Sequence, residues 1–471
     1  MVFNSLQFLC FSVLAFAGYW TLGFTRRGQN LFLLAASYVF YGWWNWRFLF
    51  LIAGCSAVNF IAGRIISVSR NCWVRRIALS VCCVVCLGAL CWFKYFNFFT
   101  GSLQSFLNMV GVKWHPLVLN VMLPVGISFF TFQALSYTID IYLGKLSPTR
   151  DWVEFFVFIG FFPQLVAGPI ERATNLLPQF QKARRFDFDA ATHGLCLIAY
   201  GLFKKMVVAD TLALYVDRVF AYPEIYSSIT CIIGAMFFSI QIYCDFSGYS
   251  DCARGIARLF GFSLMLNFDR PYLATNFIDF WRRWHISLST WFKDYVYIPL
   301  GGSRLGLFKT IRNVWIVFLL SGLWHGAAWT FVIWGALHAL FQSLNILKRK
   351  FMGVGEYGLV GRIFAVMGLN VAVAFAWIFF RSGDFQVLSR YMKVLFSGKV
   401  ATSMMQLCAM NGPVVFAFSL LAIGLLGASY FCPRDFRFGS LKSRFVFTLA
   451  CATAIVFFGM PGGGEFIYFQ F

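Results

Sequence analysis

The feature that most constrains this chain is a hydrophobic stretch, residues 313–347, with basic residues at both ends. Lys309 and Arg312 precede it, and Lys348-Arg349-Lys350 follows it. Lysine and arginine gather in the cytoplasmic loops of membrane proteins, so both ends are predicted to lie in the cytoplasm. The stretch between them must then enter the bilayer and return. The sequence therefore predicts a membrane hairpin, interrupted by Ser321-Gly322-Leu323-Trp324-His325-Gly326.

His325 is the notable residue of this interruption. It lies 13 residues after Arg312, or roughly 20 Å along a helix that rises ~1.5 Å per residue. The hydrocarbon layer is about 30 Å thick, so an ionisable ring at that depth is costly and is a candidate functional group. The alternative is a neutral histidine that is hydrogen-bonded between helices. The hairpin alone leaves both interpretations open.

The composition predicts an all-α, polytopic membrane protein. Of the 471 residues, 60% are hydrophobic and 12% are charged, about half the charge of a soluble protein. The apolar runs are too long for barrel strands and do not alternate. We expect roughly ten to twelve membrane segments in one domain, residues 1–471. Residues 5–24 are expected to be a retained span, residues 247–312 a polar insert on the cytoplasmic side, and residues 461–471 an outward aromatic tail.

Charge and cysteine usage exclude some partners. The 39 lysines and arginines, against 18 acidic residues, are scattered between spans. This distribution favours cytoplasmic loops and anionic lipids over nucleic acid. The 14 cysteines lie mainly within apolar runs, where small buried hydrophobes are the better interpretation than a metal or redox pair. We predict no metal site and no permanently bound cofactor.

Polar residues also mark the interior of other segments. Residues 152–167 form a short run that contains Pro163, which predicts a broken, re-entrant segment. Gln133, Tyr137 and Asp140 share one helix face, and Gln241, Asp245 and Tyr249 share another. Two polar rows on different spans predict a common internal chamber.

The chemistry is expected to involve histidine, because no zinc pattern, P-loop, nucleophile elbow or dinucleotide fingerprint is present. Of the five histidines, His285 stands beside Arg282 and Arg283, a cluster suited to phosphate groups. A neutral imidazole such as that of His325 can accept a proton from a hydroxyl nucleophile, as acyl transfer requires. The basic rim could hold a phosphorylated acyl donor such as a coenzyme A thioester. Proton-coupled transport explains histidine and aspartate inside a membrane equally well.

Several motifs together resemble the membrane-bound O-acyltransferase family, in particular the branch of the alginate O-acetyltransferase membrane subunit. The resemblance extends along most of the chain and implies a ring of helices, some re-entrant, around a central tunnel. By resemblance, His325 takes the place of the catalytic histidine and His285 that of a second active-site residue. The motifs are Trp281-Arg282-Arg283-Trp284-His285 and residues 321–326, with residues 124–129, 162–170, 245–251 and 297–302.

The C-terminal sequence adds a second element to the resemblance. Residues 461–464, Pro-Gly-Gly-Gly, precede Glu465-Phe466-Ile467-Tyr468-Phe469-Gln470-Phe471. Composition alone favours an aromatic anchor at the membrane surface. The ending also resembles an aromatic C-terminal motif of this branch, whose tyrosine has been proposed as a transient acyl carrier. The resemblance therefore implies a catalytic role for Tyr468.

The sequence as a whole predicts a membrane O-acyltransferase of the bacterial inner membrane. It would pass an acetyl group from acetyl-CoA, or another acyl thioester, toward an extracytoplasmic polysaccharide such as an alginate-like exopolysaccharide or peptidoglycan. His325 would be the general base, Tyr468 the nucleophile and His285 the residue that orients or polarises the thioester, with the donor near Arg282 and Arg283. Expected partners are a periplasmic acetyltransferase of the secreted esterase-like type, membrane lipid and a polysaccharide synthesis complex.

Two hypotheses of other classes remain open at this point. The first is a proton-coupled transporter or flippase for lipid-linked glycans, with Asp140, Asp245 and His325 as a proton relay. The second is a non-catalytic scaffold for a polysaccharide export complex.

Overall fold

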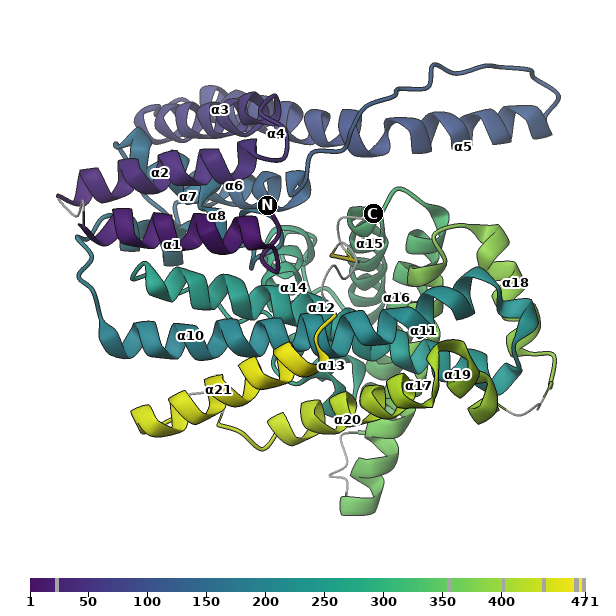
Figure 1. Ribbon diagram of the computed structural model, residues 1–471. Helices are drawn as coiled ribbons and strands as arrows, with labels where there is room; N and C mark the ends of the chain where they lie inside the picture. Colours follow the sequence, from purple (N-terminus) through teal and green to yellow (C-terminus); the bar gives the residue numbers. More distant parts are fainter. Residues whose placement is uncertain (22–24, 354–357, 400–402, 434–437, 461–465, 468–471) are drawn as a thin grey trace. The chain divides into compact units, whose positions relative to one another are not determined.

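The structure, a computed structural model, describes residues 1–21, 25–353, 358–399, 403–433, 438–460 and 466–467 (Figure 1). Every regular element among these residues is a helix, as the composition predicted. The chain divides into two compact units. The first unit comprises Met1–Leu195 and Ala253–Met265, and the second comprises Cys196–Cys252 and Leu266–Phe471.

The first unit contains the amino-terminal helices and the broken segment. Its elements are α1 (Leu6–Thr21), α2 (Arg26–Gly42), α3 (Phe48–Val68), α4 (Cys72–Leu90), η1 (Cys91–Tyr95), α5 (Phe96–Met109), α6 (Ile127–Tyr142), α7 (Trp152–Gly160), α8 (Phe162–Leu165), α9 (Ala173–Phe180) and the beginning of α10 (Phe188–Leu202).

The second unit contains the helical hairpin and the carboxy-terminal helices. Its elements are η2 (Phe203–Ala209), α11 (Asp210–Ala221), η3 (Pro223–Ile225), α12 (Ser228–Leu259, of which residues from Ala253 on belong to the first unit), η4 (Pro271–Leu273), α13 (Phe277–Arg283), α14 (Ile286–Phe292), η5 (Lys293–Tyr297), α15 (Leu307–His325), α16 (Trp329–Phe351), α17 (Leu359–Ser382), α18 (Phe385–Leu395), α19 (Ser403–Asn411), α20 (Pro413–Ser429) and α21 (Leu441–Phe458).

Seven helical segments of the described residues are long and apolar enough to cross a membrane, and the bent pair α19–α20 would make an eighth. The other segments that the sequence predicted fold as shorter or broken helices. The segment that carries the predicted polar row of Gln133, Tyr137 and Asp140 is one example, because its helix, α6, has only the 16 residues Ile127–Tyr142. The seven are Phe48–Val68, Cys72–Met109, Ser228–Leu259, Leu307–His325, Trp329–Phe351, Leu359–Ser382 and Leu441–Phe458.

The predicted break in residues 152–167 is present. Helix α7 ends at Gly160, Phe161 is non-helical with φ −53° and ψ 109°, and α8 begins directly after it. Pro163 lies in the first turn of α8. Proline has no N–H to donate, and it is tolerated there because the first turn of a helix needs none.

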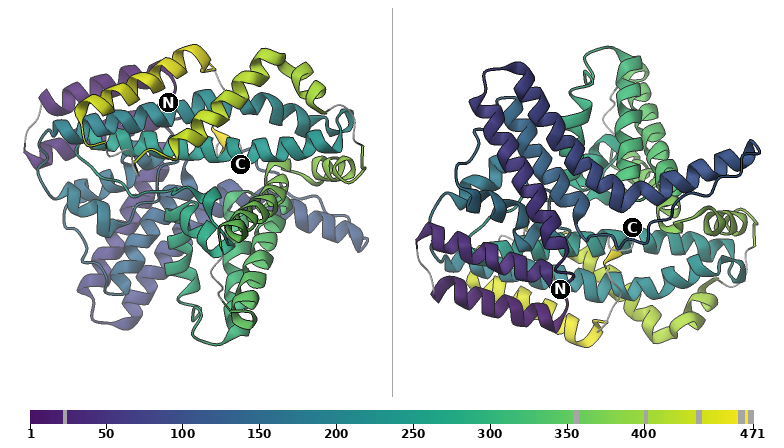
Figure 2. Two further views of the ribbon diagram at one scale, coloured as in Figure 1. Left: turned by 90° about the horizontal axis from the view of Figure 1, so that it is seen from below. Right: turned by 90° about the horizontal axis from the view of Figure 1, so that it is seen from above.

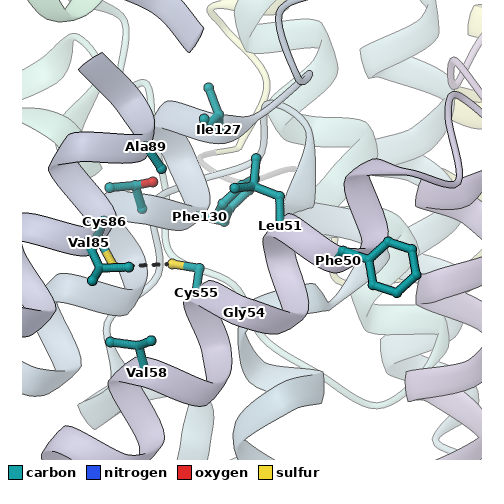
Figure 3. Close-up of a pocket in the computed structure, with 11 residues that line it drawn as sticks. Phe50, Leu51, Gly54, Cys55, Val58, Val85, Cys86, Ala89, Ile127 and Phe130 are labelled. Atoms are coloured by element: carbon teal, nitrogen blue, oxygen red, sulfur yellow. Dashed lines mark hydrogen bonds between the residues drawn. The ribbon is translucent and has the colours of Figure 1, made fainter. Parts of the chain in front are cut away.

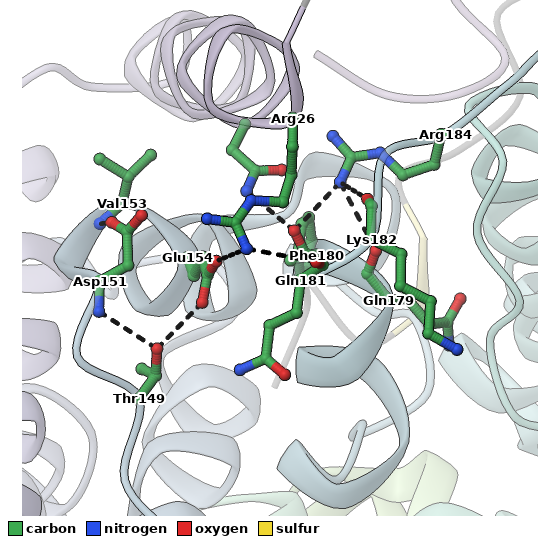
Figure 4. Close-up of polar contacts among 11 residues, drawn as sticks. Arg26, Thr149, Asp151, Val153, Glu154, Gln179, Phe180, Gln181, Lys182 and Arg184 are labelled. Atoms are coloured by element: carbon green, nitrogen blue, oxygen red, sulfur yellow. Dashed lines mark hydrogen bonds and ion pairs between the residues drawn. The ribbon is translucent and has the colours of Figure 1, made fainter.

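A polar cluster of the first unit holds α7 against neighbouring segments (Figure 4). The Glu154 carboxylate is buried, accepts a hydrogen bond from Thr149 at 3.0 Å and pairs with Arg26 of α2 at 3.3 Å. Arg26 also donates to the main-chain oxygen of Gln181 at 3.2 Å. This arrangement ties the end of α9 to α2 and α7 through one guanidinium group.

The hairpin predicted for residues 313–347 is present in the second unit. Helices α15 and α16 pack against each other and are drawn in green in Figures 1 and 2. Two glycines permit this close approach. A Cβ atom added at Gly335 would overlap the main-chain oxygen of Phe318, and one added at Gly322 would overlap that of Phe331. Small residues at such crossings are typical of membrane helix pairs.

We expect Gly335→Ala to destabilise the protein by about 1–3 kcal/mol, the usual effect of overpacking a tight contact. The added methyl group would meet main chain, which cannot turn aside as a side chain can. The midpoint of thermal unfolding in detergent, followed by tryptophan fluorescence, should fall.

Gly368→Ala in α17 is the matched control, since no atom lies within 4 Å of the added Cβ. Its midpoint should equal or exceed that of the parent protein, because alanine favours a helix over glycine. Equal midpoints for the two variants would contradict the tight crossing.

Candidate active site

His285 occupies an unusual position in the backbone of the second unit. It joins α13 to α14 and has φ 44° and ψ 56°, in the left-handed region. Its side chain is fully buried. Left-handed backbone costs a non-glycine residue about 1–3 kcal/mol and is found mainly where the surrounding structure enforces it. The sharp turn directs the chain from Trp284 into α14 at this residue.

The amide of Asn267 holds the ring of His285. Its Oδ1 atom lies 3.1 Å from His285 Nδ1 and accepts from the main-chain N–H and the hydroxyl of Ser287. The Nδ2 group of Asn267 donates to Ser250 of α12 at 3.3 Å. An amide oxygen only accepts hydrogen bonds, so His285 Nδ1 must carry the proton. Burial lowers the pKa of His285 to about 3, so the ring is neutral at pH 7 and has its lone pair on Nε2.

His325 is the last residue of α15 and is also buried, with 4% of its surface exposed. Aromatic rings surround it: the centroids of Trp334 and Phe380 lie 5.0 and 5.3 Å from that of His325. The ring of Trp324 lies 5.0 Å from His325 and 5.9 Å from His285. The structure therefore brings the two predicted histidines to one tryptophan.

A third histidine, His338, lies in the same aromatic cluster, and it was not among the predicted site residues. It is fully buried on α16, with the ring of Trp334 at 4.8 Å and that of Trp281 at 5.0 Å. Trp334 contacts both His338 and His325. The spacing Trp334-x-x-x-His338, which places both residues on one helix face, is the pattern that could have revealed this cluster.

The two predicted donor-binding arginines differ in their surroundings. Arg282 is exposed at the end of α13. Arg283 is partly buried, and its Nε atom donates to Asp279 at 3.0 Å. An exposed guanidinium can meet a phosphate without first breaking an ion pair. Of the two, Arg282 is therefore the more available.

Two residues of the C-terminal tail are described, and they lie within the second unit next to Phe246, a neighbour of His285. Phe466 and Ile467 are both buried. The N–H of Ile467 donates to Asp245 Oδ2 at 2.8 Å, and the ring of Phe466 lies 5.8 Å from that of Phe246, whose own ring lies 4.7 Å from His285. Tyr468, the predicted nucleophile, lies outside the described residues.

The two polar rows predicted on helix faces lie in different units. In the first unit, Gln133 donates to the main-chain oxygen of Phe158 at 2.7 Å, and the Tyr137 hydroxyl accepts from the N–H of Thr149 at 3.3 Å. In the second unit, Asp245 pairs with Lys205 at 2.7 Å and accepts from Ile467. Each row thus has partners within its own unit, and a chamber common to both rows stays a prediction.

An apolar cavity lies within the first unit, and none of the predicted site residues lines it. It has a volume of about 170 Å³ and is lined by side chains of α3, α4 and α6, among them Phe50, Val85 and Phe130 (Figure 3). The thiols of Cys55 and Cys86 stand 3.5 Å apart in its wall. Both cysteines are buried and unoxidised, as the sequence predicted for thiols in apolar runs.

Long apolar helices, with one buried histidine at the end of a hairpin helix and a second that shares a tryptophan contact with it, define a class of multi-span membrane protein with a polar site inside. Residues 143–354, which include both histidines, match the family described as MBOAT, membrane-bound O-acyltransferase family. The chain is 40% identical over 401 residues to the probable alginate O-acetylase AlgI of Pseudomonas aeruginosa, which covers 84% of this chain and 75% of that protein. The chain belongs to the membrane-bound O-acyltransferase family and is a multi-span membrane acyltransferase.

Relatives with other names are also similar to this chain. A peptidoglycan O-acetyltransferase of Helicobacter pylori is 35% identical over 446 residues, which cover 87% of this chain and 82% of that protein. A teichoic acid D-alanyltransferase of Bacillus subtilis is 28% identical over 242 residues, or 48% of this chain and 59% of that protein. Membership of an acyltransferase family requires an acyl donor as substrate, and it favours acyl transfer over the transporter and scaffold hypotheses.

Asn267→Asp should change the pH dependence of acyl transfer in a defined direction. A carboxylate beside Nδ1–H stabilises the imidazolium form, so it raises the pKa of His285. If His285 acts as a neutral ring, the acid limb of the pH–rate profile should move up by about one unit or more. The profile of kcat/KM for the acyl donor measures this shift.

Ser250→Ala serves as the control for Asn267→Asp. It removes the partner of Asn267 Nδ2 but leaves the oxygen that faces His285. Its acid limb should coincide with that of the parent protein. A limb that stays in place in Asn267→Asp would contradict a catalytic role for neutral His285.

Proposed function

We propose that this acyltransferase moves an acetyl group from a cytoplasmic thioester, acetyl-CoA, across the bacterial inner membrane for O-acetylation of an extracytoplasmic polysaccharide. The names of its relatives, alginate O-acetylase and peptidoglycan O-acetyltransferase, support an alginate-like exopolysaccharide or peptidoglycan as the acceptor. The observation that carries the proposal is the approach of His285 and His325 to the shared ring of Trp324. Buried imidazoles in an apolar surrounding suit proton transfer to and from a hydroxyl and a thiol.

In the proposed reaction, His325 is the general base and Tyr468 is the nucleophile. The Tyr468 hydroxyl gives its proton to His325, and its oxygen attacks the thioester carbonyl carbon. The carbon–sulfur bond then breaks, and the leaving thiolate takes the proton from the imidazolium of His325. The products are an acetyl ester of Tyr468 and free coenzyme A, with His325 neutral again.

His285 supports this reaction as a hydrogen-bond acceptor. The sequence left two roles open, orienting the thioester or polarising it. A neutral ring that donates Nδ1–H to Asn267 has only a lone pair at Nε2. A lone pair cannot donate to a carbonyl oxygen, so the geometry favours orientation over polarisation. An amide N–H or a hydroxyl group of the donor is a suitable partner.

The donor and the final acceptor complete the proposal. The exposed guanidinium of Arg282 suits the phosphates of coenzyme A. The helices would surround a tunnel through which thioester and acceptor meet from opposite sides. A periplasmic acetyltransferase of the secreted esterase-like type would take the acetyl group from the tail to the polysaccharide, within a synthesis complex at the membrane.

Replacing His325 by alanine should abolish acyl transfer. Loss of a general base lowers rates by about 10²–10⁴-fold. The measurement is incorporation of labelled acetyl groups from acetyl-CoA by the purified full-length protein. His115→Ala, at an exposed position of the first unit, should match the parent. Parental activity in His325→Ala would rule out the proposed mechanism.

Replacing Tyr468 by phenylalanine should remove the label from the C-terminal peptide, because the acetyl ester needs the phenolic oxygen. Mass spectrometry of that peptide after incubation with acetyl-CoA measures the effect. Tyr222→Phe, at an exposed tyrosine of the second unit, is the control and should keep the label. An undiminished label in Tyr468→Phe would exclude this tyrosine as the carrier.

A further inference from the structure

Lys205 stands between two carboxylates in the interior of the second unit. Its Nζ atom lies 2.8 Å from Asp210 Oδ1 and 2.7 Å from Asp245 Oδ1. The exposed fractions of the three side chains are 13% for Lys205, 5% for Asp210 and 2% for Asp245. One cation shared by two buried carboxylates leaves a deficit of positive charge. Further hydrogen-bond donors are therefore needed to stabilise the carboxylates.

The tail supplies one such donor. Asp245 uses Oδ1 for Lys205 and Oδ2 for the main-chain N–H of Ile467, at 2.8 Å. A hydrogen bond to an ionised carboxylate is shorter and stronger than one between neutral groups. Because the bond is made to the main chain, it fixes the position of the backbone whatever the side chain of residue 467.

Aromatic packing aligns the same part of the tail. The ring of Phe466 lies 4.9 Å from that of Tyr249 and 5.8 Å from that of Phe246. Upstream, the N–H of Met460 donates to the main-chain oxygen of Met206, within η2, at 3.1 Å. The π-helix η2, which carries Lys205, thus contacts the chain at the end of α21 and, through Asp245, at Ile467.

Two glycines in the sequence explain why the π-helix η2 lies so close to α12. Gly201 and Gly248 meet where the end of α10 crosses α12, and a Cβ atom on either would collide with the main-chain oxygen of the other. This close crossing brings both lysines of η2 to α12, where Lys204 pairs with Asp251 at 2.6 Å and Lys205 with Asp245. Single π-helical turns are rare and occur frequently at functional sites.

We propose that the Lys205–Asp245 ion pair is a positioning device for the C-terminal tail: it binds the main chain of Ile467 and so holds the acyl-accepting segment beside the His285 end of the site. This inference rests on the proposed function, in which Tyr468 is the acceptor. Successive Cα atoms lie about 3.8 Å apart, so a restraint on Ile467 limits the movement of the residue that follows it. Orientation of a nucleophile raises kcat without changing the affinity for the donor.

Asp245→Asn tests the device in the full-length protein. The substitution keeps the shape of the side chain but removes the charge that Lys205 and the tail N–H both need. The amide hydrogens of the C-terminal peptide should exchange with solvent about 10-fold faster or more, measured by hydrogen–deuterium exchange and mass spectrometry. The kcat for acetylation of the tail should fall by a similar factor, with the KM for acetyl-CoA unchanged.

Asp251→Asn is the matched control. Asp251 lies on the same helix and pairs with the neighbouring lysine, Lys204, whereas the bond to the main chain of Ile467 is made by Asp245. Its tail exchange and its kcat should equal those of the parent. A neutral residue at position 205 should lower kcat and speed the exchange of the tail amides. Lys205→Arg keeps the cation, so both quantities should stay close to those of the parent.

A second variant acts on the tail and leaves the helices untouched. Ile467→Pro removes the N–H that Asp245 binds, whereas Ile467→Val keeps it with nearly the same side chain. The kcat of the proline variant should fall as that of Asp245→Asn does, and the kcat of the valine variant should equal that of the parent. This pair keeps the test valid even if Asp245→Asn fails to fold.

The outcomes separate the inference from the proposed function. Unchanged tail exchange in both Asp245→Asn and Ile467→Pro would overturn the positioning device. Faster exchange with an unchanged kcat would overturn its role in catalysis. Faster exchange in a protein whose parent never acetylates its tail would support the device as a tail anchor and contradict Tyr468 as the acceptor.

Discussion

The structure of the site depends on one buried amide, that of Asn267. It connects α12, through Ser250, with the turn that contains His285, and its oxygen receives donors from both Ser287 and the imidazole. In an apolar interior, no water replaces a missing partner, so every such group must be satisfied by the protein. The left-handed backbone of His285 persists because the main chain on its C-terminal side is bound as well: the N–H of Ile286 donates to the main-chain oxygen of Asn267 at 2.9 Å. One polar residue thus fixes the position and tautomer of the histidine, and burial keeps the ring neutral.

The two histidines are held by different means, which suits different roles. His285 has a polar partner that determines which nitrogen carries its proton. The described ring contacts of His325 are aromatic, with Trp324, Trp334 and Phe380 around it. In the proposed mechanism, these different surroundings accompany different roles, with His325 as the general base and His285 as the orienting residue.

The sequence predicted the features that depend on neighbouring residues and missed those that depend on distant ones. Basic residues on both sides were enough to predict the hairpin of α15 and α16, and Pro163 was enough to predict the break before α8. Helix α12 continues to Leu259, into the predicted polar insert that begins at residue 247. It can do so because Asp245 and Asp251 form ion pairs with lysines of η2. The bond between Asp245 and Ile467 spans 222 residues. Helical periodicity describes only one helix, so it could not reveal that contact or the turn at His285.

Helix α12 links the tail to the histidine. Asp245 binds Ile467, Phe246 contacts both Phe466 and His285, and Ser250 binds the amide that orients His285. These three positions lie within six residues of one helix, so they move as a rigid body. A tail that is bound at Asp245 therefore meets a histidine whose orientation depends on the same helix. In the proposed mechanism the nucleophile directly follows Ile467 in the sequence, so the helix that binds Ile467 would also help to align it with the orienting residue.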